Sequence, residues 1–216
     1  MIKNIKPMKI FTIFILLWVL SIAIVLSNNK LTKAATDNVA VSTAVQASLS
    51  FSITAGDTVA FGPLTAGVPI AAPNTGTIAS VTTNASNGYT IGVSDGVVGS
   101  NSALLHTDTT TRITDVTSGD ITTPALWGSS TGLGITMFAA DTTPEAKWCN
   151  DVCTSYNDAD NKYAAIPETA TTAHTVTGAV VGANTSSWAF KLDVPADQKT
   201  GNYSGNVTFT ATAVLG

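Results

Sequence analysis

The sequence predicts an all-β protein, an antiparallel β-sandwich of the immunoglobulin-like or jelly-roll-like kind, on three observations. Apolar and polar residues alternate with period two in several segments, which is the pattern of strands with one buried face. Threonine, which favours strands, is abundant, whereas only 11% of the residues are charged. Asn, Gly and Pro residues separate the segments at short intervals, as turns do. We therefore expect about eight to ten strands in one domain of residues 35–216.

The N-terminal segment predicts export. Three lysines precede an uncharged apolar run over residues 10–26, and small residues follow at Ala34 and Ala35. This is the order of a secretory signal peptide, residues 1–34, cleaved near Ala34 or Ala35. A retained membrane anchor is the alternative, because a helix of this length spans about 25 Å against a bilayer core of about 30 Å. Either reading predicts a secreted or cell-surface domain that contacts the membrane only through this segment.

The charge of the domain excludes one class of partner. Without residues 1–34, five basic and fourteen acidic residues leave a net charge of −9. A chain this acidic repels phosphate backbones, so we expect no nucleic-acid partner.

Four segments alternate with period two, and each is expected to lie in a sheet: 38–54, 77–94, 174–181 and 187–215. Asn87-Gly88 predicts a hairpin that pairs the two strands of the second segment. The Pro- and Gly-containing loop of residues 195–201 predicts a closing hairpin in the last segment. One shared core is expected to contain Phe51, Ile53, Ile91, Val93, Trp188, Phe190, Leu192, Val207 and Phe209.

Three short motifs carry a resemblance: Phe61-Gly62, Asn87-Gly88-Tyr89 and the stretch from Gly201 to Thr210. Together they resemble exported bacterial surface β-sandwich proteins. The last motif is similar to the final strand of spore-coat-U and pilin-like domains and of WxL-type cell-wall-binding domains. The chain departs from the WxL pattern, because neither Trp127 nor Trp188 is followed by x-Leu, and it lacks the additional cysteines usual in spore-coat-U proteins. The resemblance implies a non-catalytic surface protein and leaves its ligand open.

Alternation stops between residues 141 and 167, which we interpret as a loop insert. Cys149 and Cys153 lie in it, and in an exported chain two cysteines this close predict a disulfide. A redox motif has two intervening residues where this pair has three, and a zinc site needs two further ligands.

The insert is also where we expect recognition, because long loops of compact domains are often functional. Trp148 and Tyr156, together with Trp127, are candidates for a surface on which a sugar stacks. Asp151, Asp158 and Asp160 are candidate calcium ligands, although the spacing is not that of an EF-hand. The alternatives are a solvated acidic loop and a loop that only caps the sandwich. Calcium is the one cofactor considered.

Catalysis finds little support in the sequence. His106 and His174 lie in Thr-rich, strand-like contexts, and no Gly-x-Ser-x-Gly motif is present. We therefore expect a non-catalytic structural or adhesive protein that associates with itself or with a cell-envelope component. The alternative is a carbohydrate-binding module whose glycan contacts the insert.

Overall fold

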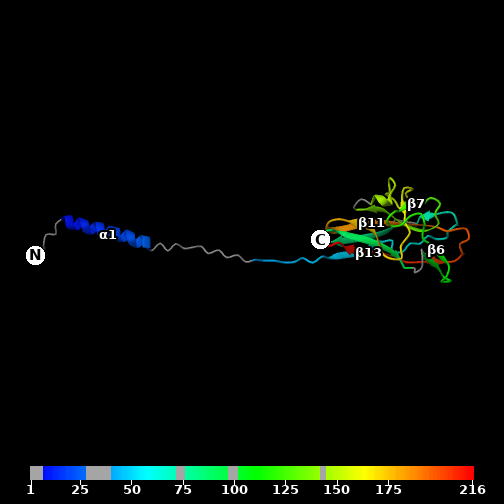
Figure 1. Cartoon of the computed structure of the whole chain (residues 1–216), viewed down its shortest axis with the longest axis horizontal. Coiled ribbons are helices and arrows are strands. Elements are labelled where there is room, and N and C mark those ends of the chain that lie inside the picture. Colours follow the sequence, from blue (N-terminus) through cyan, green and yellow to red (C-terminus); the bar gives the residue numbers. More distant parts are fainter. Residues whose placement is uncertain (1–6, 28–39, 72–75, 97–101, 142–144) are drawn as a thin grey trace. The chain divides into compact units, whose positions relative to one another are not determined.

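The computed structural model describes residues 7–27, 40–71, 76–96, 102–141 and 145–216 (Figure 1). The chain divides into two units, residues 1–44 and residues 45–216. The first unit contains α1 (Pro7–Ser27), whose run of apolar residues is uninterrupted by Gly. Pro7 is tolerated because the first helical residue needs no backbone N–H donor. Among the described residues, no helix meets the length and hydropathy needed to cross a membrane.

The second unit is an all-β sandwich, which confirms the predicted fold class. Its first sheet is built on the long strand β11 (Val180–Asp193). Because Trp188 pairs with both Thr77 and Met137, β3 and β8 lie on opposite edges of β11. The other members of this sheet are β1 (Leu49–Ala55), β2 (Ile70–Ala71), β3 (Thr77–Thr83) and β8 (Gly132–Ala140), and β1 pairs with β3.

The second sheet has the order β10–β4–β13, formed by Thr171–Val176, Tyr89–Asp95 and Val207–Ala213. Two smaller sheets flank the sandwich. One contains β5 (Ser102–His106), β6 (Arg112–Thr114) and β12 (Tyr203–Ser204), and the other β7 (Ala125–Leu126) and β9 (Lys162–Tyr163). A short 3-10 helix, η1, spans Ala146–Trp148.

The predicted core is confirmed. All nine residues named for it belong to one apolar cluster, in which those of β4 and β11 are fully buried and those of β1 and β13 are half-buried. Trp188 of the first sheet contacts Phe209 of the second, with ring centroids 5.5 Å apart. The side chains of the two sheets therefore interdigitate, as in other aligned sandwiches.

The predicted Asn87-Gly88 hairpin is wrong. β3 pairs with β1 and β11, whereas β4 pairs with β10 and β13, so the turn carries the chain from one sheet to the other. Its five residues are long enough to cross the roughly 10 Å between packed sheets. Gly88 still needs its glycine, because its φ is +83° and a Cβ would collide with the Val176 carbonyl.

The predicted closing hairpin is also wrong. β11 and β13 lie in different sheets, and β12 forms between them. The alternation of β11 and of β13 correctly predicts which residues point inward. The inward residues of the two strands, however, face each other across the core. Likewise, 174–181 is not one strand: β10 ends at Val176, β11 begins at Val180, and Gly178 between them has a φ of +86°.

The long first strand is shorter than predicted. β1 begins at Leu49, and residues 40–48 belong to no strand; residues 38 and 39 lie outside the described part of the chain. β1 has its first partner at Thr83, the last residue of β3. Val41 and Val45 are 90% and 82% exposed. Within the described part of the chain, the alternating residues 40–48 therefore have no neighbouring strand.

Candidate functional site

The predicted disulfide is present. Cys149 and Cys153 are bonded, with their Cα atoms 5.8 Å apart. The loop that they close is joined to the segment after it, because the Asn150 N–H donates to the Asp160 carbonyl at 3.0 Å and Cys149 pairs with Asn161. The insert is therefore an ordered structure with its own hydrogen bonds.

The three candidate calcium ligands do not converge. Oδ2 of Asp158 accepts hydrogen bonds from the backbone N–H groups of Thr154 and Ser155, at 2.6 and 2.8 Å. Oδ1 of Asp160 accepts one from the Asn150 side chain, and Asp151 is exposed. Within the described ranges, no group of three or more His, Cys, Asp or Glu residues is placed to hold a metal ion. The carboxylates of Asp158 and Asp160 instead stabilise the turn.

The prediction that Trp148 offers a ligand surface is wrong. Its side chain is fully buried, and its Nε1–H donates to the Ala173 carbonyl at 3.0 Å. The 3-10 turn at Ala146–Trp148 directs it into the core, where its ring lies edge-on to Trp188. Ala164 and Ile166, later in the insert, are buried as well. These residues of the insert are thus part of the core, which corrects the interpretation of residues 141–167 as a loop insert outside it.

Trp127 is also buried, so the prediction that it forms part of a ligand surface is wrong. It is 5% exposed and packs edge-on against Tyr163, with ring centroids 5.2 Å apart. The Lys191 ammonium lies 5.2 Å and 5.4 Å from the centroids of these two rings, and burial lowers the pKa of Lys191. Tyr156 is half-buried. The three predicted aromatic residues therefore do not form a shared platform.

The two histidines lie in different sheets. His106 of β5 is held locally, with Nδ1 accepting the Asp108 N–H at 3.1 Å. His174 of β10 is buried, with Nδ1 3.5 Å from a Glu145 carboxylate oxygen. Burial lowers the pKa of His174, so the ring is neutral at pH 7. The two histidines therefore lie apart in the fold, and each contacts its own neighbours.

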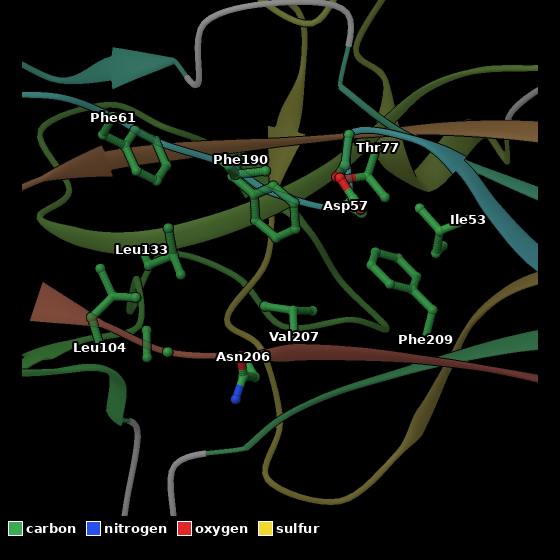
Figure 2. Close-up of a pocket in the computed structure, with 14 residues that line it drawn as sticks. Ile53, Asp57, Phe61, Thr77, Leu104, Leu133, Phe190, Asn206, Val207 and Phe209 are labelled. Carbon is green, nitrogen blue, oxygen red and sulfur yellow. The ribbon is translucent and has the colours of Figure 1, made fainter.

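A groove that the sequence did not reveal opens between β1 and β13 (Figure 2). It encloses a cavity of about 240 Å³. In Figure 2, Ile53 and Phe209 lie at one end, Phe61 and Leu104 at the other, and Phe190 between them. The walls are thus mostly apolar. The polar residues that line the groove are Asp57, Thr77 and Asn206.

The groove exists because the core is incompletely covered at this edge. In the inner strands β3 and β4, every second residue is fully buried. In β1 and β13, the corresponding residues are only half-buried. Each of these strands has one strand neighbour among the described residues, β3 for β1 and β4 for β13. Apolar side chains and unpaired backbone groups are therefore accessible together.

Both edge strands lack charged residues and prolines, two of the features that usually prevent further pairing. Natural edges are protected by charged residues, prolines or bulges. β1 and β13 contain no charged residue and no proline. β13 pairs with β4 over seven consecutive residues without a bulge, whereas β1 has an irregularity between Ile53 and Ala55. β13 is accordingly the more regular edge for an additional strand.

Known proteins give no guide to this site. The chain matches no family model, and no curated protein is detectably similar to it.

Proposed function

We propose that this chain is a non-catalytic structural protein of the cell surface or extracellular space, which assembles by accepting a strand at the edge between β1 and β13. The observation that carries the proposal is the open groove, with half-buried apolar side chains beside two strand edges that contain no charged residue and no proline. Strand addition at such an edge gains backbone hydrogen bonds along the strand and side-chain burial at alternate positions.

Burial of apolar surface favours the addition of a strand at this edge. Each Å² of apolar surface that an incoming strand removes from water contributes about 25 cal/mol. The half-buried side chains of Ile53, Val207 and Phe209 supply this surface. The two edge strands carry no charge that would have to be buried, and of the residues that line the groove only Asp57 is charged.

Export supports the same proposal. Disulfides form and persist in oxidising compartments, and the Cys149–Cys153 bond fits an exported domain. The charged and apolar pattern of residues 1–34 has the order of a signal peptide. A domain at the surface then finds its partners in copies of itself or in a component of the cell envelope.

We do not retain glycan binding by the insert as a second function. That hypothesis rested on Trp148 and Tyr156, together with Trp127, and both tryptophans are buried while Tyr156 is half-buried.

The proposal is tested by blocking the edge. Thr208 and Thr210 are exposed residues of β13, and lysines at both positions place two charges beside its free edge. The matched control carries lysines at Thr172 and Thr175, exposed residues of β10 at the opposite edge of the same sheet. Both variants add the same charge to the same sheet.

The size of the exported protein is measured by light scattering over a range of concentrations. We expect the parent and the β10 control to form assemblies and the β13 variant to remain much smaller. A monomeric parent at high concentration would contradict the proposal, as would equal assembly of the two lysine variants.

A further inference from the structure

We propose that the strand accepted by the β1–β13 groove is residues 40–47 of a second copy of the chain, paired with the β13 edge. This inference rests on the proposed function and names its partner segment.

The segment has the pattern of a strand without a neighbour. Its odd positions, including Val41 and Val45, continue the phase of the inward residues of β1, and polar or small residues alternate with them. Both valines are almost completely exposed. A single exposed valine is unremarkable, but two on one face of an alternating segment form an apolar strip that folding of the chain has left uncovered.

The chemistry of the segment matches the groove. No charged residue occurs between residues 38 and 56, so the entering strand brings no ion of its own to be desolvated, and Asp57 is the one charged residue that lines the groove. Residues 40–47 would extend about 27 Å as a strand, which is long enough to pair with all seven residues of β13. Valine and alanine side chains are small enough for a cavity of about 240 Å³ whose wall already includes three phenylalanine rings.

The C-terminal end of the segment is held by hydrogen bonds to Asn84. Ser48 donates its backbone N–H to Oδ1 of Asn84 at 2.6 Å, and Nδ2 of Asn84 donates to the Gln46 carbonyl at 3.0 Å. Asn84 directly follows Thr83, which is the partner of Leu49 in the β1–β3 ladder. These bonds hold residues 46–48 at Asn84, next to the end of the β1–β3 ladder.

Return to the same molecule would need a reversal between residues 40 and 46. That stretch contains Ser42 but no Gly, Pro, Asn or Asp, the other residue types that favour tight turns. A turn within it would also leave fewer residues than are needed to pair with all seven of β13. A second copy needs no such reversal, so we assign the groove to residues 40–47 of another molecule.

Disulfide trapping between two full-length variants tests the assignment. One carries Val45→Cys, and the other carries Val207→Cys, an inward residue of β13 that lines the groove. The control replaces Val45→Cys with Ala44→Cys, which lies on the opposite face of the same segment. The native Cys149–Cys153 bond is kept oxidised throughout, so only the introduced thiols react.

We expect the mixed dimer from Val45→Cys to exceed that from Ala44→Cys several-fold. Equal yields from the two variants would overturn the inference. A bond that forms instead within one chain carrying both Val45→Cys and Val207→Cys, independently of dilution, would assign the groove to its own segment. Efficient trapping of Thr210→Cys with itself, without any Val45→Cys product, would assign it to β13 of a second copy.

A peptide of residues 40–48 provides an independent measurement. We expect an excess of this peptide to reduce assembly of the full chain several-fold, and the peptide with Val41→Asp and Val45→Asp to have no effect. Equal effects of the two peptides, or none from the parent peptide, would overturn the inference. If assembly nevertheless depended on the β13 edge in the lysine variants, the proposed function would stand and only the identity of the strand would be wrong.

Discussion

The indole of Trp148 packs edge-on against the indole of Trp188, with ring centroids 5.8 Å apart and an angle of 83° between the planes. One ring comes from the insert and the other from the central strand β11. Both side chains are fully buried. This contact makes the segment of residues 141–167 a structural component of the sandwich.

We therefore predict that Trp148→Ala lowers the free energy of unfolding by about 3–5 kcal/mol, because it leaves a large cavity and removes the donor to the Ala173 carbonyl. Urea denaturation of the purified protein measures this. Tyr156→Ala, at a half-buried position of the same insert, serves as the control and is expected to cost much less. A loss below about 1 kcal/mol for Trp148→Ala would show that the insert is dispensable.

The two tryptophans are also expected to be coupled. Trp188→Ala alone should cost about 3–5 kcal/mol, since its ring also contacts Phe209. Edge-to-face pairs contribute about 0.5–1.5 kcal/mol beyond area burial. A double-mutant cycle on unfolding free energies should return a coupling energy of this size. Strict additivity would mean that the observed ring geometry has no energetic consequence.

Removal of the Cys149–Cys153 bond should have a modest effect. The closed loop is very short, so the chain-entropy contribution is about 2 kcal/mol at most. We expect the Cys149→Ser, Cys153→Ser double variant to fold with slightly reduced stability, as measured by its melting temperature. Thiol labelling of the unreduced parent should detect no free cysteine, and two reactive thiols would contradict the assignment.

Asp115 should make stability depend on pH. Burial, followed by the charges of Asp95 and Glu168, raises the pKa of Asp115 to about 7. Between its unfolded pKa of about 4 and its folded pKa, the folded state holds a proton that the unfolded state has lost. This carboxyl therefore destabilises the fold progressively as the pH rises from about 4 to about 7.

The Asp115→Asn substitution keeps the shape of the side chain and removes the carboxyl group that titrates. We expect it to raise the melting temperature more at pH 8 than at pH 4, measured against the parent by calorimetry. Asp120→Asn is the control, because hydrogen bonds from Thr122 and Thr123 lower the pKa of that exposed carboxyl. The same shift at both pH values for Asp115→Asn would contradict the raised pKa.

Strand positions could be predicted from the sequence because alternation is a local property. Ile91, Val93 and Trp188 are buried as their phase indicates. Pairing partners could not be predicted, because the chain around Asn87-Gly88 is compatible with a turn within a sheet or between sheets. Long-range contacts decide between them, and here β10 and β13 occupy both edges of β4.

The site was harder to predict for two separate reasons. Trp148 lies in a segment without periodicity, so nothing local indicates that a 3-10 turn directs it inward. The groove depends on which strands cover which edge: β1 and β3 have similar alternation, yet only β3 is covered on both sides. Burial of an inward residue is thus a property of its neighbours as much as of its own pattern.

Amide hydrogen exchange of the purified protein, compared between dilute monomer and assembled material, tests the central claim most directly. The account predicts that assembly slows exchange in residues 40–47 and 207–213 and leaves residues 171–176, at the opposite edge of the second sheet, unchanged. Unchanged exchange in β13 on assembly, or protection confined to β10, would show that the groove between β1 and β13 is not where copies of this chain meet.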